Sequence, residues 1–452
     1  MSHTIVAQAT ATGLAGLAII RVSGDDAFTI SDKCFAGKKK IIDAKSHTIL
    51  YGDFIYDNVI IDNVTCSIFH KPHSYTGEDT IEFGTHGGTI IPSQIINALI
   101  NAGCKYAEPG EFTRRAFING KINLMQAEAV ADIIHSISVP SATISAKQLQ
   151  GGITNELDKL RTNLLNIAST IELEMDFAEE NIILNSNENI LEHLNNAINT
   201  TSKLINTFKS SNILRDGFVV AIIGKPNAGK STLFNSFLNS QRAIISAIPG
   251  TTRDYISEVI YINDIPIKII DTAGLRETTD IIEIEGIEYT YKILKQANLI
   301  LFINDISNNN NTELLQHINQ KYANTKVILV NNKMDLCSDN LHIQNINDIE
   351  SFNISANQQN ENFIKLKNRI ADIVKEKIQN INDILLNERQ YFILVETLNS
   401  LNIARELLLK NTIAEILSIE IRNAGRLLGE LTGQSWSEEV LNNIFDRFCI
   451  GK

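Results

Sequence analysis

The chain has 452 residues, 44% of them apolar, and a formal net charge of −12 at pH 7. This length allows two to four domains with their own cores, and the absence of a basic arm excludes strong nucleic acid binding by charge alone. The five cysteines form no CxxC pair, and no signal peptide or long apolar span is evident, which argues against a disulfide framework, a structural zinc site and a membrane protein. We therefore expect a cytoplasmic protein.

Residues 1–118 predict an α+β domain, because short β-branched runs alternate with glycine-containing turns. The polar residues that stand out in and just after this segment are Arg21, Glu78, Arg115 and Lys121. Composition alone does not separate a site from ordinary surface charges here, and for Arg115 we expect an ordinary surface charge.

Residues 119–216 predict helices. Apolar residues recur every three or four positions between 157 and 175, and a second series of this kind runs from 190 to 208. The pattern returns in residues 379–452. We therefore expect one helical domain, split in sequence by an insert that covers residues 217–378.

The insert alternates apolar strands with helical stretches, which is typical of a parallel sheet covered by helices on both faces. Its first strand leads into Gly224-x-x-x-x-Gly229-Lys230-Ser231 and then a helix, the context that a phosphate-binding loop requires. In such a loop, backbone N–H groups at the helix start bind phosphate oxygens. Lys230 would reach the β- and γ-phosphates, and the Ser231 hydroxyl would bind Mg²⁺.

Three later segments of the insert resemble the translation-factor-like GTPases. They are "PGTTRD", "IIDTAG" and "NNKMD", and the resemblance implies that Thr252 binds Mg²⁺ and that Asp271 holds a magnesium-bound water. The Asp335 carboxylate can accept both donors of the guanine edge, a pattern that adenine does not offer, so the expected nucleotide is GTP or GDP. The full set of expected GTP-binding residues is Asn227, Ala228, Gly229, Lys230, Ser231, Thr232, Ser246, Ala247, Ile248, Pro249, Gly250, Thr251, Thr252, Asp271, Thr272, Ala273, Gly274, Asn332, Lys333, Asp335, Ser355 and Ala356.

The C-terminal segment predicts a helix over 437–448 that follows a capping box, Ser435-x-x-Glu438. Phe448 is its last apolar residue, and we expect its burial to hold the terminus in place. The chain then ends "CIGK", which lacks the pattern of a prenylation box. A frayed tail and a functional tail are both compatible with these residues.

From "TIVAQAT" through "SYTGED", "HGG", "PGEFTRRAFINGK" and "QAEAVADII" to "FCIGK", nearly the whole chain resembles the MnmE (formerly TrmE) family of tRNA-modifying GTPases. The resemblance implies a multidomain α/β protein with a folate-binding N-terminal domain, a discontinuous all-α helical domain and an inserted Ras-like P-loop GTPase domain. It also implies a homodimer formed through the N-terminal domain, and work with the flavoprotein MnmG, in a heterotetramer, on the wobble uridine of certain tRNAs. There a carboxymethylaminomethyl or aminomethyl group is added to carbon 5 of the base.

Individual roles follow from the same resemblance. Leu275 stands after Gly274, where Ras-like GTPases have a glutamine that orients the attacking water, and the family pattern implies that Glu283 orients it here, with Lys230 as the second catalytic residue. A K⁺ ion in the place of an arginine finger would be held by Asn227, Ser246, Ile248 and Thr251. A tetrahydrofolate derivative, 5-formyl or 5,10-methylene, would be bound by Arg21, Glu78, Lys121 and Lys452, with Cys449 close to the one-carbon group.

Two functions remain open at this point. One is a tRNA-modification enzyme that couples GTP hydrolysis to one-carbon transfer. The other is a regulatory GTPase, a switch in ribosome assembly or signalling whose outer domains only bind.

Overall fold

The computed structural model describes residues 3–176, 187–239, 257–262, 265–271, 293–306, 312–336, 349–358, 360–378, 384–410 and 414–452. The chain forms two compact units. Unit 1 comprises Met1–Ile134, Ala146–Thr201 and Phe392–Lys452, and unit 2 comprises His135–Ser145 and Ser202–Tyr391. The domain boundaries expected at 118, 216 and 378 divide the chain differently and stay predictions.

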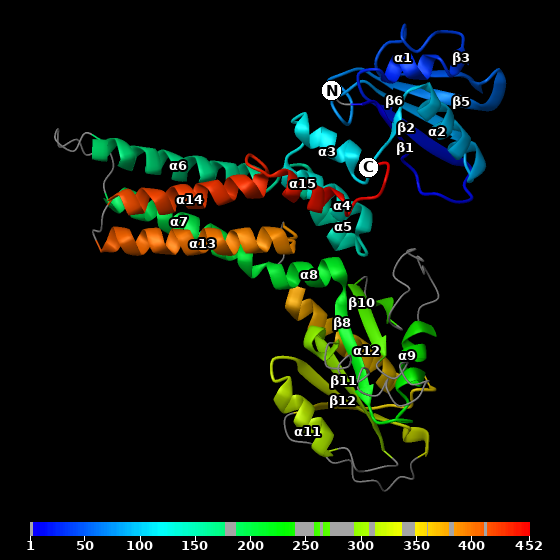
Figure 1. The fold of residues 1–452 in the computed structure, drawn as a ribbon. Helices are drawn as coiled ribbons and strands as arrows, with labels where there is room; N and C mark the ends of the chain where they lie inside the picture. Colours follow the sequence, from blue (N-terminus) through cyan, green and yellow to red (C-terminus); the bar gives the residue numbers. More distant parts are fainter. Residues whose placement is uncertain are drawn as a thin grey trace, which may run out of the picture. The chain divides into compact units, whose positions relative to one another are not determined.

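Unit 1 begins with a seven-stranded sheet in the order β3-β4-β5-β6-β2-β1-β7, antiparallel except for the β1–β7 pair (Figure 1). Helices α1 and α2 pack on it over a buried apolar cluster that includes Phe54, Phe83 and Leu99. The strands and helices of this part are β1 (Ile5–Gln8), β2 (Leu17–Ser23), α1 (Ala27–Asp32), β3 (Phe35–Gly37), β4 (Thr48–Tyr56), β5 (Val59–Phe69), β6 (Thr80–His86), α2 (Ile90–Ala102), β7 (Lys105–Tyr106) and α3 (Glu111–Ile118).

The periodic segments are helices, as predicted. Before the second sheet in sequence come α4 (Leu124–His135), α5 (Val139–Leu149), α6 (Thr154–Asp176), α7 (Asn187–Asn206) and α8 (Phe208–Asp216), and after it come α13 (Glu388–Leu409), α14 (Ala414–Thr432) and α15 (Glu438–Phe445).

Helices α6 and α14 come from opposite sides of the insert in sequence and lie side by side (Figure 1). Two glycines of α14 allow the close approach. A Cβ atom at Gly425 would lie 2.9 Å from Leu165 Cδ2, and one at Gly429 would lie 2.9 Å from Arg161 Nε. The helical domain is therefore built from segments far apart in the sequence.

The last helix corrects one prediction. Ser437, and not Ser435, is the N-cap of α15, because its side chain accepts a hydrogen bond from the backbone N–H of Val440. The helix is also shorter than predicted, ending at Phe445. Phe448 is nevertheless buried against Phe445, so the expected burial at the terminus is confirmed.

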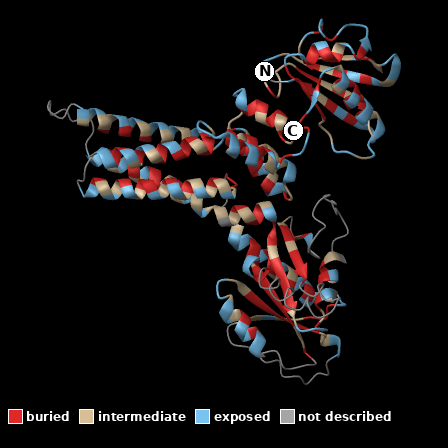
Figure 2. Cartoon of the chain, in the orientation of Figure 1, coloured by how far each residue is buried: buried red, intermediate tan, exposed pale blue. Residues whose placement is uncertain are grey.

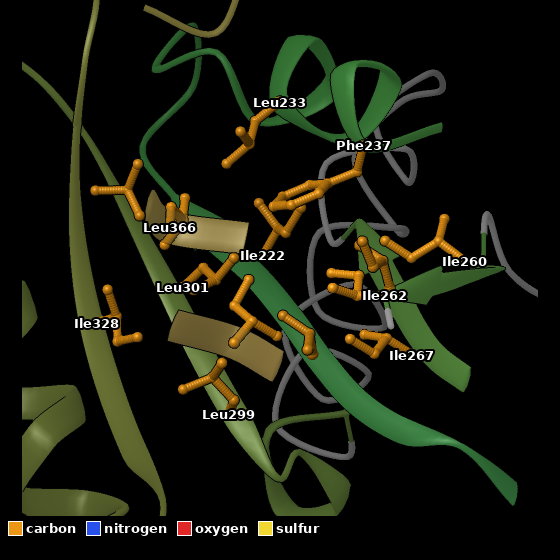
Figure 3. Close-up of a cluster of buried hydrophobic side chains, with 14 of the residues drawn as sticks. Ile222, Leu233, Phe237, Ile260, Ile262, Ile267, Leu299, Leu301, Ile328 and Leu366 are labelled. Atoms are coloured by element: carbon orange, nitrogen blue, oxygen red, sulfur yellow. The ribbon is translucent and has the colours of Figure 1, made fainter. Parts of the chain in front are cut away.

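Unit 2 contains a six-stranded sheet in the order β13-β12-β11-β8-β10-β9, parallel except for β9. Helices α9 and α12 contribute to a core that includes Ile222, Leu233, Phe237, Leu301 and Leu366 (Figure 3), and its central strands are largely buried (Figure 2). This is the predicted α/β domain. Its elements are β8 (Phe218–Gly224), α9 (Lys230–Asn239), β9 (Ser257–Ile262), β10 (Ile265–Asp271), β11 (Leu299–Asp305), α11 (Thr312–Lys321), β12 (Lys326–Asn332), the 3₁₀ turn η2 (Met334–Leu336), β13 (Glu350–Asn353) and α12 (Glu361–Ile378).

Candidate nucleotide site and tail-associated polar cluster

The loop between β8 and α9 encloses the amine of Lys230. This side chain is 8% exposed, and its Nζ donates to the carbonyl oxygens of Gly224 at 2.9 Å and Lys225 at 2.8 Å. Asn227 takes a positive φ of 62° and Gly229 one of 96°, which wraps the backbone around the start of the helix. The geometry matches that of an anion-binding loop.

The loop helix and strand β10 bring two oxygen donors together. The Ser231 hydroxyl donates to Asp271 Oδ2 at 2.9 Å, and Asp271, at the end of β10, is buried. A hydroxyl beside a carboxylate suits a small, hard cation such as Mg²⁺, which prefers oxygen ligands and usually completes its shell with phosphate and water. No cluster of three or more His, Cys, Asp or Glu side chains at metal-binding distance occurs among the described residues.

Asn332 joins the phosphate loop to the segment expected to hold the base. Its Nδ2 donates to the carbonyl oxygen of Ala228 at 2.9 Å, and its Oδ1 accepts from the backbone N–H of Ala356 at 2.8 Å. Because Asn332 is buried, both bonds are shielded from water. The three segments are thus fixed to one another at the carboxyl ends of β8, β12 and β13, the edge where parallel α/β sheets bind ligands.

The remaining residues expected around the base lie beside Asn332. Lys333 Nζ forms an ion pair with Asp305 Oδ2 at 2.6 Å, and Asp335 accepts a hydrogen bond from the Ser355 hydroxyl. Thr232 is on α9, one residue after Ser231. The described members of the expected GTP-binding set thus lie at the ends of β8, β10, β12 and β13 or on the segments that follow them, and their role in binding GTP stays a prediction.

Part of that set lies outside the described residues. These positions are Ser246, Ala247, Ile248, Pro249, Gly250, Thr251, Thr252, Thr272, Ala273 and Gly274. Glu283, the expected water-orienting residue, also lies outside the described residues. The expected roles of these residues stay predictions.

In unit 1, Arg21 and Glu82 form a partly buried pair on the first sheet. They face each other across β2 and β6, with Arg21 Nε 2.9 Å and Nη2 2.8 Å from Glu82 Oε1. The guanidinium carbon lies 5.1 Å from the centre of the Tyr75 ring and 5.5 Å from that of Phe112, distances at which cation–π attraction operates. Arg21 Nη1 is buried without a hydrogen-bond partner among the described residues.

Glu78 is engaged elsewhere. Its Oε2 accepts from Arg115 Nη1 at 3.0 Å and from the Ser23 hydroxyl at 2.8 Å. Arg115 is 9% exposed and also pairs with Glu111 at 2.7 Å. The expectation that Arg115 is an ordinary surface charge is therefore wrong, because it is the buried cation that neutralises Glu78.

Glu82 was missed by the sequence reasoning. It lies on β6 within "TIEFG". Its pairing with Arg21 could have been inferred only from the register of β6 against β2, and the sequence does not reveal that these two strands are neighbours. Lys121, also expected here, is exposed and its Nζ donates to the Pro72 carbonyl at 2.9 Å.

The C-terminal tail of the chain docks beside the Arg21–Glu82 pair. Ile450 forms an antiparallel bridge with Pro109, the Gly110 N–H donates to the Cys449 carbonyl at 3.4 Å, and the Phe112 N–H donates to the Lys452 carbonyl at 3.2 Å. The tail is thus bound to the N-terminal part of its own chain, and the frayed-tail alternative is wrong.

The tail has a charged end and a free thiol. Burial, and next the positive charge of Arg21, lower the pKa of the Lys452 amine, while Glu82 acts in the opposite direction. Cys449 is a free, exposed cysteine. Two cations, one carboxylate and an unpartnered guanidinium nitrogen, beside two aromatic rings, form a donor-rich cluster that suits a planar, polar or anionic ligand.

Comparison with known proteins covers the whole chain. Residues 4–121 match the model described as "GTP-binding protein TrmE N-terminus", and residues 124–449 match the "MnmE helical domain". The tRNA modification GTPase MnmE of Flavobacterium psychrophilum is 40% identical over 99% of both chains, and that of Cytophaga hutchinsonii is 37% identical over 100% of this chain and 98% of its own.

One solved structure, an Aquifex aeolicus Era variant bound to GDP·AlF4⁻, is 27% identical over 40% of this chain and 66% of its own, with a TM-score of 0.27. None of the described helices is both long enough and apolar enough to cross a bilayer.

Proposed function

This chain belongs to the MnmE family of tRNA-modification GTPases, and on that premise we propose how its residues serve the activity. It binds and hydrolyses GTP in the modification of tRNA. We propose that the reaction is the addition of an aminomethyl-type group to carbon 5 of the wobble uridine, carried out together with the flavoprotein MnmG and a folate one-carbon unit by a homodimer of this chain.

The nucleotide would lie across the strand ends of unit 2. Support for this comes from Asn332, whose two buried hydrogen bonds tie the phosphate loop to the Ala356 segment. In this proposal Lys230 binds the β- and γ-phosphates, Asp335 accepts from the guanine edge, and Ser231 with Thr252 holds Mg²⁺, which supplies charge neutralisation at the phosphates.

Hydrolysis requires an oriented water and a positive charge at the departing γ-phosphoryl group. Leu275 has no hydrogen-bonding group, so we assign the water-orienting role to the Glu283 carboxylate. A K⁺ ion held by Asn227 and the 246–251 segment would supply the charge.

The folate derivative would bind at the tail-docked cluster of unit 1. The supporting observation is Arg21, whose buried Nη1 has no hydrogen-bond partner in the described part of the chain and therefore gains a hydrogen bond when a ligand oxygen arrives. Lys452 supplies a second cation. Glu78, which Arg115 and Ser23 hold in place, keeps acceptor capacity on its carboxylate and would contact the ligand as well.

The experiment is nucleoside analysis of tRNA from cells that lack this protein, complemented with the wild type or with Lys230→Ala. We expect the wild type alone to restore the modified wobble uridine. Restoration by Lys230→Ala would show that the modification does not depend on GTP hydrolysis. Unmodified tRNA in cells complemented with the wild type would overturn the proposed reaction.

A further inference from the structure

A row of three asparagine side chains crosses the sheet of unit 2 where three parallel strands end. Asn304 on β11, Asn331 on β12 and Asn353 on β13 are neighbours in register. Asn304 Nδ2 donates to Asn331 Oδ1 at 3.1 Å, and Asn331 Nδ2 donates to Asn353 Oδ1 at 2.9 Å. We call these three residues the asparagine ladder.

The ladder stands at the end of an apolar layer. Phe302 and Leu329, two residues earlier on β11 and β12, are buried in the core on that face of the sheet, since side chains two apart in a strand share a face. Asn331 itself is 3% exposed. A buried amide is unfavourable unless it is hydrogen-bonded. Asn331 finds its two hydrogen-bond partners, Asn304 and Asn353, only while β11, β12 and β13 keep their present register.

Each ladder residue precedes a different part of the expected base site. Asn304 is followed by Asp305, which pairs with Lys333 at 2.6 Å. Asn331 is followed by Asn332, which binds the Ala228 carbonyl and the Ala356 N–H.

Asn353 leads through Ile354 into Ser355, whose hydroxyl donates to Asp335. Two backbone bonds connect the same strand ends, from the Ile354 N–H to the Asn331 carbonyl at 2.8 Å and from the Met334 N–H to the Ile354 carbonyl at 3.2 Å.

We propose that the asparagine ladder is a positioning element that sets the geometry of the guanine pocket. It fixes the register of the three strand ends, so that Asp335 and the Ala356 N–H can bind the same base. The inference rests on the proposed base-reading role of Asp335. Because the ladder lies on the opposite face of β12 from Asn332, it acts through the backbone and does not touch the nucleotide.

The test is Asn331→Leu, which keeps the side-chain shape and removes both ladder hydrogen bonds. Titration of the full-length protein with GDP and with IDP, which lacks the 2-amino group, should show that the Kd for GDP rises about tenfold and that the preference for GDP over IDP falls. The KM for GTP should rise in parallel while kcat at saturating GTP stays within twofold, since the ladder affects binding of the base in ground state and transition state alike.

Asn298→Ala is the matched control. The Oδ1 atom of Asn298 accepts from the Val219 N–H at 2.8 Å and so joins β8 to the residue just before β11, at the opposite end of the sheet. This variant should lose stability without a change in the GDP/IDP preference. An equal loss of preference in both variants, or a Kd for Asn331→Leu within twofold of the wild type, would overturn the proposal.

Two further variants cover the cases in which Asn331→Leu does not fold or the premise about Asp335 is wrong. Asn353→Ala removes only one ladder bond at a half-buried position and should give a smaller effect of the same kind if Asn331→Leu does not fold. Asp335→Ala tests the premise separately. Normal GDP binding by Asp335→Ala would reject the proposed base-reading role of Asp335. Weak GDP binding by Asp335→Ala together with normal GDP binding by Asn331→Leu would reject only the role of the asparagine ladder.

Discussion

Replacing Gly451 by alanine should release the C-terminal tail. Gly451 has a φ of +95°, and a Cβ atom there would lie 2.1 Å from the Gln8 carbonyl oxygen. Backbone strain of this kind costs about 1–3 kcal/mol, and the overlap with a backbone carbonyl adds to it.

The contacts that hold the tail are of similar size. Its two backbone hydrogen bonds, to the N–H groups of Gly110 and Phe112, contribute about 0.5–1.5 kcal/mol each. The substitution therefore offsets most of the docking free energy, and because about 1.4 kcal/mol is a factor of ten, protection of the Phe112 amide should fall about tenfold or more.

Hydrogen exchange of the peptide that contains Phe112 measures this directly, with tRNA modification and GTP hydrolysis assayed on the same preparation. Modification should fall with protection, and GTP hydrolysis should not change. Gly88→Ala is the control, because Gly88 has a φ of +102° but no atom of the described residues lies within 4 Å of the added Cβ. Wild-type exchange at Phe112 in Gly451→Ala would refute the reasoning.

Other expectations follow from the same two sites. GTP turnover should be much faster in KCl than in NaCl at equal ionic strength, and equal rates would remove the K⁺ proposal. Glu283→Ala should abolish hydrolysis and leave GDP affinity within about twofold, since a water-orienting group acts mainly in the transition state; a large loss of affinity would indicate a structural role. Cys449→Ser should abolish tRNA modification at normal GTP turnover, whereas normal modification would show that the thiol is dispensable. Burial and the charge of Arg21 lower the pKa of Lys452, so the protonated amine disfavours docking; this penalty is full below the lowered pKa and declines to zero as pH rises from there to the ordinary pKa of a free lysine. Lys452→Met should therefore strengthen Phe112 protection at pH 7 while weakening folate binding, and weaker protection would contradict this sign.

The parts of the fold that sequence predicted well are those carried by local patterns. Periodicity sufficed for α6 and α7, and the strand-loop-helix context of Lys230 sufficed for the phosphate loop. Side-chain partners across strands were not predictable in this way. Arg21 and Glu82 are 61 positions apart, and nothing local indicates that β2 and β6 are neighbours.

The burial of the charged pair Arg115 and Glu78 was equally unpredictable from the sequence. Arg115 and Glu78 both sit in polar segments that resemble surface, and only the packing of α3 against the first sheet makes their pairing compulsory. The prediction of the N-cap of α15 was wrong for a different reason. Ser435 and Ser437 both stand just before the acidic start of this helix, and only the backbone geometry and hydrogen bond at Ser437 show which serine is the cap.

The packing of α6 against α14 has a consequence for how the chain is made. Asp176 ends α6 and Ala414 begins α14, about 240 residues later. At a synthesis rate of 5–20 residues per second, roughly 12 to 48 s pass on the ribosome before the partner helix exists. During that interval the side of α6 that packs against α14, which includes Arg161 and Leu165, lacks this cover while the whole inserted domain emerges. Until α14 is made, this side of α6 is open to aggregation and to chaperone binding, and a stalled ribosome within the insert would leave it exposed.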